Sequence, residues 1–304
     1  MNGIQVRTPV AADGRLGAAA EHPGLSDPDY LLRRRAIVAL ARGHQVGDPS
    51  PQVDYSQSED RTWRTVLRAL RKAQDEHACR AALDARDQAP IPVDHVPQHA
   101  EVGTQLRRLT GFDFTLTGGM VENKRFLGSM AEGYLHVVQF VRHPAVPQYT
   151  PEPDIIHDVF GHGIHLASPA FADIYRLVGH AASRIERKDV LQMISDVYWF
   201  TLEYGVLDEN GTPKAYGAAL LSSYGEIRRL DAACIRPLDI NAMLSTAYHY
   251  HGYQPVLFSA RSLDEVTDTL ADFLERLDDD SAPRRPGKRR ADDRHAQRWA
   301  DQES

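Results

Sequence analysis

Two histidines, His157 and His162, lie five positions apart, directly after a turn that contains Pro151 and Pro153. Neutral imidazole is the commonest protein ligand for transition metals, so a close histidine pair beside carboxylates is a candidate metal site. An ideal α-helix places positions five apart roughly 140° from each other, on different faces. Both rings can therefore reach one ion only at a helix end or a local distortion, which Gly161 would permit.

Glu203 is the candidate for a third ligand. If its segment is helical, its neighbours three and four positions away are all apolar: Trp199, Phe200, Val206 and Leu207. A carboxylate among such side chains is costly unless it is paired or bound to a cation. Two histidines and one carboxylate leave coordination positions open for dioxygen, as in non-haem Fe(II) oxygenases. Taken singly, His157 is more often a hydrogen-bonded core histidine, and Glu203 more often a helix-end residue, than a metal ligand.

The elements that must position these residues are mostly helical. Apolar periodicity predicts helices over 61–86, over 102–109 with an end near Gly111, over 170–186 and over 189–206, with Gly205 marking the end of the last. Residues 112–123 read as a strand and loop, and Asn210-Gly211 as a turn. A capping-box pattern at Ser262 begins a closing amphipathic helix that reaches about Leu277.

Composition indicates one ordinary globular domain. The chain has 304 residues, is 42% hydrophobic, carries a net charge of −7 and has only two cysteines. The negative net charge does not favour binding to nucleic acid, and two cysteines do not indicate a disulfide framework. No apolar run is long enough to span a membrane, so we expect a cytoplasmic protein. Residues 1–21 read as a flexible leader and residues 278–304 as a charged, disordered tail without apolar heptads, so we expect a monomer.

Three stretches carry a resemblance to a known family. They are YTPEPDIIHDVFGH at 149–162, WFTLEYG at 199–205 and YGAALLSSYGE at 216–226. In this order they resemble the catalytic domain of the tetrahydropterin-dependent aromatic amino acid hydroxylases, over about residues 22–277. The resemblance implies a single, mainly α domain with minor β, an Fe(II) ion held by His157, His162 and Glu203, and a tetrahydropterin cofactor. It also implies a monooxygenase that uses dioxygen to hydroxylate the ring of a free aromatic amino acid.

The resemblance further implies a cofactor site. An aromatic face suits offset stacking on a flat heterocycle, and Phe126 would stack on the pterin ring. His136 and Leu127 would contact the same cofactor, and Asp158 would reach it through water. Tyr198 would form a hydrogen bond near the iron-bound water.

At the substrate end, Arg142 offers the planar fork that pairs with a carboxylate, although as an isolated residue it suits a surface equally well. The resemblance makes it the anchor for the amino acid's carboxylate. Further residues are expected to line the pocket: Thr150, Trp199, Tyr204, Ala219 and Ser222.

Three positions depart from the family's usual pattern. Asp158 replaces a common glutamate, Tyr204 a phenylalanine and Ala219 a glycine. The added hydroxyl and methyl in the pocket would reposition the substrate ring. Hydroxylation of L-phenylalanine to tyrosine is the leading expectation, and phenylalanine 3-hydroxylation to meta-tyrosine, tryptophan hydroxylation and tyrosine hydroxylation stay open.

Two other classes of function also remain. A zinc hydrolase would use the same three ligands with a metal-bound water and Asp158 as base. A non-catalytic protein that binds a metal or an amino acid would keep the ligands without turnover.

Overall fold

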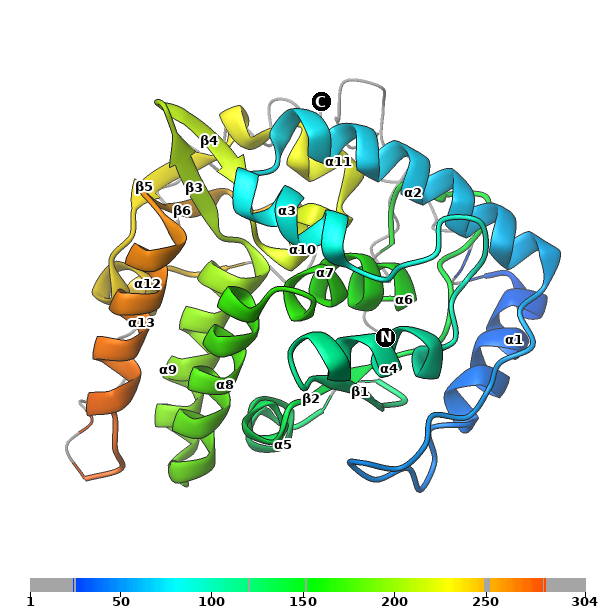
Figure 1. Ribbon diagram of the computed structural model, residues 1–304, viewed down its shortest axis with the longest axis horizontal. Helices are drawn as coiled ribbons and strands as arrows, with labels where there is room; N and C mark the ends of the chain where they lie inside the picture. Colours follow the sequence, from blue (N-terminus) through cyan, green and yellow to red (C-terminus); the bar gives the residue numbers. More distant parts are fainter. Residues whose placement is uncertain are drawn as a thin grey trace.

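A computed structural model describes residues 24, 26–119, 121–150, 152–248, 252–280 and 282. Most of this part is helical, with one two-stranded and one four-stranded sheet (Figure 1). The leader expected at 1–21 lies outside it, as does all of the tail beyond 282. No helix in the described ranges is both long enough and apolar enough to cross a membrane.

The N-terminal half wraps the outside of the domain. Helix α1 (Pro28–Ala39) lies at one side, and the long α2 (Gln57–His77) runs along the top edge in Figure 1, followed by α3 (Arg80–Gln88) and α4 (His99–Leu109). Strand β1 (Asp113–Leu116) pairs in parallel with β2 (Tyr134–Val137), and α5 (Asn123–Gly128) with a 3₁₀ turn (Ser129–Glu132) connects them.

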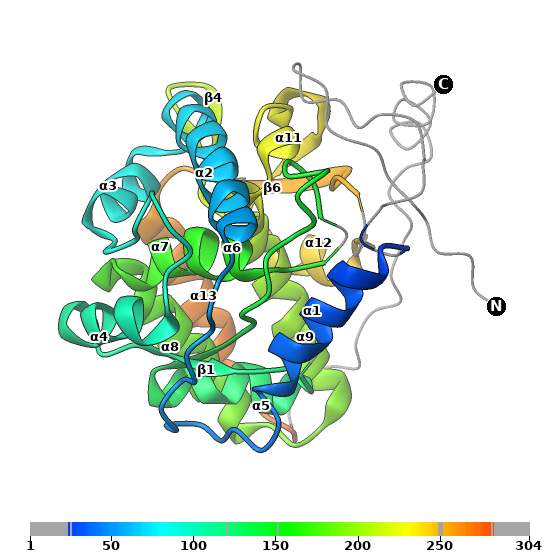
Figure 2. The same ribbon diagram turned by 90° about the vertical axis from the view of Figure 1, so that its right-hand side faces the viewer.

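The C-terminal half carries the central helices. The elements α6 (Ile155–His157), a π turn (Asp158–His162) and α7 (Gly163–Leu166) are followed by the long α8 (Pro169–Arg184) and α9 (Lys188–Tyr198). A second π turn (Trp199–Glu203) continues α9. The closing α13 (Leu263–Arg276) packs beside α8 (Figures 1 and 2).

The larger sheet has the strand order β4-β3-β6-β5. Strands β3 (Val206–Glu209) and β4 (Thr212–Ala215) form a hairpin, and β6 (Val256–Ala260) pairs in parallel with both β3 and β5 (Cys234–Pro237). Short helices fill the connections: α10 (Ala218–Ser222), α11 (Tyr224–Ile227), a 3₁₀ turn (Leu230–Ala232) and α12 (Ile240–Ser245).

Several predicted elements are confirmed. Helix α4 ends before Gly111, which has φ +79°, and the Asn210-Gly211 turn has positive φ at both residues. The closing helix begins at Ser262, whose hydroxyl accepts a hydrogen bond from the Glu265 amide. The mainly α fold with small sheets agrees with the predicted class.

Two predicted helices have different limits. The helix expected over 61–86 is two helices, because the Cys79 amide donates to the Ala215 carbonyl and Ala78 forms a bridge to the same β4 residue. Residues 189–206 stop being helical at Glu203, and Val206 already belongs to β3. In both places a sheet takes the backbone hydrogen bonds that a longer helix would have used. Helix α1 was not predicted.

Candidate active site

Two π turns bring the metal-ligand candidates together. His157 ends α6, His162 ends the first π turn, and Glu203 ends the second. A π turn bonds each amide to the carbonyl five residues earlier, so positions five apart face the same side, which an α-helix does not allow. The local distortion expected between the two histidines is therefore confirmed.

The three ligand candidates converge. His162 Nε2 lies 3.1 Å from His157 Nε2 and 3.1 Å from a Glu203 oxygen, while His157 Nε2 lies 3.7 Å from the other Glu203 oxygen. One ligand atom from each residue falls within 4.8 Å of the others, and the described residues contain no second group of this kind. Two imidazoles and a carboxylate in this arrangement are the donor set of a facial triad.

Gly161 is required for this arrangement. A Cβ at this position would lie 2.6 Å from the Ala218 carbonyl oxygen, because the first π turn packs directly against α10. The glycine that the sequence marked as a possible site of distortion therefore also allows the close approach of two backbones.

Neighbouring hydroxyls orient the two imidazoles. His157 Nδ1 lies 3.0 Å from the Ser222 hydroxyl, and His162 Nδ1 lies 2.6 Å from the Tyr175 hydroxyl. Each bond occupies the far ring nitrogen, so the Nε2 atoms face the shared centre, as second-shell partners of metal-binding histidines do. The sequence did not single out Tyr175, and no local pattern marks it.

His165 is held by structural contacts outside the ligand cluster. It is completely buried, its Nδ1 lies 2.9 Å from the Tyr175 hydroxyl and its Nε2 lies 2.6 Å from the Tyr216 carbonyl oxygen. Its ring also stacks on Phe171 with centroids 4.3 Å apart. Both nitrogens are thus engaged away from the ligand cluster.

Electrostatics favour a bound cation at the cluster. Burial opposes the charge on Glu203, but the neighbouring charge and hydrogen bond of His162 outweigh it and lower the carboxyl pKa to about 2. Burial lowers the pKa of His157 to about 4, so its imidazole is neutral at physiological pH. An ionised carboxylate beside a neutral His157 suits metal binding. Burial lowers the pKa of His162, but the Glu203 charge outweighs it and raises that pKa, so a bound metal would have to displace a proton from His162.

The residues expected around the pterin lie on one side of the cluster. Tyr198 stacks near His162, with ring centroids 6.4 Å apart, and the Phe126 ring meets Tyr198 edge-on at 5.8 Å. Phe126 and His136 have centroids 6.3 Å apart. The Leu127 side chain, by contrast, is 2% exposed in the core, so a contact with a cofactor would have to come from its backbone.

Tyr198 and Asp158 contribute buried polar groups on this side. The buried Tyr198 hydroxyl has no hydrogen bond of normal geometry within the described residues, while burial and then the Glu203 charge raise its pKa well above the usual value. Burial also raises the pKa of Asp158 to about 7, and its carboxyl oxygen accepts a 2.6 Å bond from the Val138 amide. Asp158 is therefore held by the backbone that follows β2.

The expected substrate anchor is a buried ion pair. Arg142 Nη2 and Nε lie 2.8 and 3.0 Å from the two oxygens of Asp154, and the side chains are 3% and 0% exposed. Asp154 also caps α6 by accepting from the His157 amide. One carboxylate therefore links the guanidinium to the first metal ligand. Asp154 lies in the first of the three family motifs, but its pairing with Arg142 was not predicted from the sequence.

The other expected pocket residues have definite partners. The Thr150 hydroxyl donates to the Glu152 carbonyl oxygen at 2.9 Å. The Trp199 ring packs against the Tyr204 ring, with centroids 4.9 Å apart. Ala219 lies on α10, which also carries Ser222.

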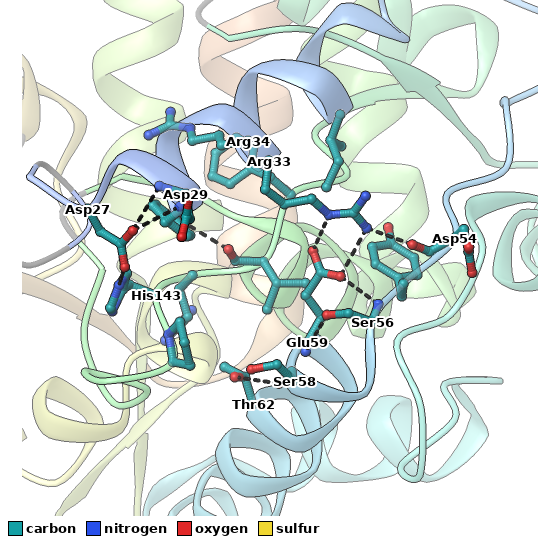
Figure 3. Close-up of a pocket in the computed structure, with 17 residues that line it drawn as sticks. Asp27, Asp29, Arg33, Arg34, Asp54, Ser56, Ser58, Glu59, Thr62 and His143 are labelled. Carbon is teal, nitrogen blue, oxygen red and sulfur yellow. Dashed lines mark hydrogen bonds and ion pairs between the residues drawn. The ribbon is translucent and has the colours of Figure 1, made fainter.

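Helix α1 supports the chain around Arg142. The Asp27 carboxylate and the His143 ring lie 3.1 Å apart, the Tyr30 hydroxyl donates to the Val141 carbonyl oxygen, and Arg34 pairs with Glu152 through Nη1 and Nη2. A cavity of about 530 Å³ lies here, between α1, the start of α2 and residues 140–144 (Figure 3). The four basic residues that line it, Arg33, Arg34, Arg142 and His143, each pair with a carboxylate, so we interpret the cavity as part of this support.

Comparisons with known proteins agree with this geometry. A family model described as biopterin-dependent aromatic amino acid hydroxylase matches residues 11–282. The chain is 43% identical over 260 residues to phenylalanine 3-hydroxylase of Streptomyces coeruleorubidus, covering 86% of this chain and 93% of the relative. It is 33% identical over 261 residues to a chloroplastic phenylalanine 4-monooxygenase of Pinus taeda, covering 85% and 73%.

A solved structure agrees as well. Phenylalanine hydroxylase of Chromobacterium violaceum, with bound iron(III) and 7,8-dihydrobiopterin, superposes with a TM-score of 0.72 at 25% identity, covering 80% of this chain and 90% of that one. The family expected from the sequence is confirmed: this chain belongs to the biopterin-dependent aromatic amino acid hydroxylases and is a pterin-dependent monooxygenase.

Proposed function

We propose that this protein hydroxylates the ring of free L-phenylalanine with Fe(II), a tetrahydropterin and dioxygen. The observation that carries the proposal is the convergence of His157, His162 and Glu203 inside a chain of this family. When bound, the iron, the pterin and dioxygen together supply the oxidant for the ring. The protein's own residues have to hold the metal, orient the amino acid and limit the access of water.

Arg142 is the residue proposed to bind the amino acid's carboxylate. Asp154 engages its Nε and Nη2, which fixes the plane of the guanidinium, while its Nη1 makes a longer 3.4 Å contact with the Pro147 carbonyl oxygen. A planar, permanently charged fork held in one orientation suits carboxylate recognition. Such positioning converts binding energy into alignment of the ring with the metal.

The pterin is proposed to lie on the side of the cluster that carries Phe126, His136 and Tyr198. Their rings form contiguous contacts next to His162. The His136 Nε2 atom is buried without a hydrogen-bond partner among the described residues, and a bound heterocycle would supply one. Asp158 projects from the adjoining π turn and would contact the same ligand through water.

Hydroxylation at the para position is the leading expectation, and the meta position is a second candidate with specific support. The relative with 43% identity is a phenylalanine 3-hydroxylase. Tyr204 and Ala219, which the family resemblance places at the ring pocket, are both larger than the residues usual in the family at these positions. The extra hydroxyl and methyl would move the substrate ring relative to the metal.

The deciding experiment is a product analysis. Purified protein is loaded with Fe(II) without oxygen and then given oxygen, tetrahydrobiopterin and phenylalanine, with products separated against ortho-, meta- and para-tyrosine. A para or a meta product supports the proposal and identifies the ring position. The proposal is refuted if phenylalanine yields none of the three while the protein retains iron and Glu203→Ala loses it. Tyrosine and tryptophan are tested in parallel as competing substrates.

Membership of this monooxygenase family argues against the zinc hydrolase and the non-catalytic protein that the residues alone left open.

A further inference from the structure

A hydrogen-bond relay runs from His162 to a backbone carbonyl through Tyr175 and His165. His162 Nδ1 lies 2.6 Å from the Tyr175 hydroxyl, which lies 2.9 Å from His165 Nδ1. His165 Nε2 in turn lies 2.6 Å from the Tyr216 carbonyl oxygen. All four residues are between 0% and 3% exposed, so bulk water does not compete for these bonds.

The carbonyl at the far end fixes the direction of every bond in the relay. A carbonyl oxygen can only accept, so His165 carries a proton on Nε2. Burial lowers the pKa of His165 to about 3, which leaves the ring that single proton. His165 Nδ1 is therefore an acceptor, and the Tyr175 hydroxyl donates to it. Because a hydroxyl has one proton, the Tyr175 oxygen has to accept from His162, whose Nδ1 must carry a proton.

This direction suits the role of His162 as a ligand. With Nδ1 protonated, the lone pair that can bind a metal is on Nε2, the atom 3.1 Å from a Glu203 oxygen. His157 is held in the same tautomer by a shorter route. Its Nδ1 contacts the Ser222 hydroxyl, and that hydroxyl donates directly to the Ala218 carbonyl oxygen at 2.8 Å. The relay therefore does for one ligand through two side chains what a serine does for the other.

Packing holds both ends of the relay. The His165 ring stacks on Phe171, with centroids 4.3 Å apart and an interplanar angle of 9°. Phe171 and Tyr175 are four positions apart on α8, so they lie on the same face of that helix. The Tyr216 amide donates to the Gly205 carbonyl oxygen at 3.0 Å, two positions after the third ligand candidate. The relay thus joins the second ligand to the segment that carries the third.

We propose that His165 is a positioning residue that acts through Tyr175: it accepts the phenol proton, so that the Tyr175 oxygen accepts from His162 and Nε2 of that ring is kept for a metal. This inference rests on the metal site of the proposed function. If His165 only filled space, it would affect the site with or without the Tyr175 hydroxyl. A residue of the relay acts only while that hydroxyl is present.

A double-mutant cycle on metal-free protein separates these two roles. Tyr175→Phe removes the hydroxyl, His165→Leu removes its acceptor, and titration with cobalt measures the affinity of the ligand cluster. We expect Tyr175→Phe to weaken cobalt binding about 10- to 100-fold and His165→Leu about tenfold, as outer partners of metal ligands do. The double variant should bind cobalt as tightly as Tyr175→Phe alone, within about twofold.

Tyr55→Phe is the matched control. The Tyr55 hydroxyl also donates to a backbone carbonyl, that of Gln139 at 2.8 Å, but it lies just before α2 and outside the relay. This variant should bind cobalt like the wild type. Wild-type cobalt affinity in folded His165→Leu overturns the inference, and so do losses that multiply in the double variant.

Nitrogen-15 NMR of the histidine rings tests the bond directions without a substitution, and it decides the question if a variant fails to fold. In zinc-loaded wild-type protein we expect a proton on Nε2 of His165 and on Nδ1 of His162. A proton on Nδ1 of His165 overturns the inference. Neither measurement uses substrate or pterin, so a protein that shows the relay but hydroxylates no amino acid refutes the proposed function alone.

Discussion

Replacing Gly161 with alanine should damage the metal centre, whereas the same change at Gly163 should not. A Cβ at Gly161 would lie 2.6 Å from the Ala218 carbonyl oxygen, inside the closest distance that real Cβ contacts reach. The added Cβ is fixed to the Gly161 backbone and the atom it meets belongs to the Ala218 backbone. Neither can rotate away, so one of the two packed segments must move. At Gly163 the nearest atom, in the Phe114 ring, is 3.5 Å away, an ordinary van der Waals contact.

The two substitutions should change the free energy of unfolding in opposite directions. An alanine is worth about 0.5–1 kcal/mol over glycine in a helix interior, which Gly163→Ala should gain. Gly161→Ala should lose about 1–3 kcal/mol through overpacking, only partly offset by that gain. The displaced segment, α10, also carries Ser222, which orients His157, so we expect metal affinity to fall by about tenfold or more.

Urea unfolding of the two metal-free variants measures the stability difference. Titration with cobalt, followed by its absorbance, measures the affinity of the ligand cluster. If Gly161→Ala and Gly163→Ala have the same unfolding midpoint and the same cobalt affinity, the close approach of the π turn to α10 does not determine the metal geometry and the reasoning is wrong.

Three further predictions concern the surroundings of the cluster. Ser222→Ala removes the hydroxyl at His157 Nδ1 and should weaken cobalt binding about 10- to 100-fold with little change in fold, as measured by titration and circular dichroism. Glu226 has its pKa raised by burial from 4.5 to about 8, so the folded state keeps a proton that the unfolded state releases. Stability should therefore decrease as pH rises between these values, and Glu226→Gln should flatten that part of the curve of unfolding free energy against pH. Arg34→Met removes the ion pair with Glu152 and should raise the KM for phenylalanine more than it lowers kcat. Equal effects on KM and kcat would argue against a role of this ion pair in substrate binding.

The local part of the site could be predicted well. Residue types and the five-residue spacing of His157 and His162 indicated a metal site that needs a distorted helix, and the π turn has that distortion. Gly205 and Asn210-Gly211 predicted the end of the segment that carries Glu203 and the turn that follows. Each of these features depends on residues that are close in the chain.

Features that depend on distant partners were not predictable in the same way. The pairing of Cys79 with Ala215 divides a periodic helical stretch, because a sheet edge competes for the backbone amide. The Tyr175 hydroxyl reaches His162 from α8, and Gln254, in the segment that precedes β6, contacts the Trp199 indole. No spacing within one segment marks such contacts.

By itself, then, the sequence determined which residues could do chemistry, the family to which their motifs belong and most of the helices that carry them. Only the tertiary structure decided that two π turns place His157, His162 and Glu203 within 4.8 Å, that Asp154 joins Arg142 to α6, and that hydroxyls fix the rings. The physical reason is range. Periodicity, caps and turns act over a few residues, whereas a buried ion cluster is assembled by core packing and backbone contacts between segments far apart in the chain.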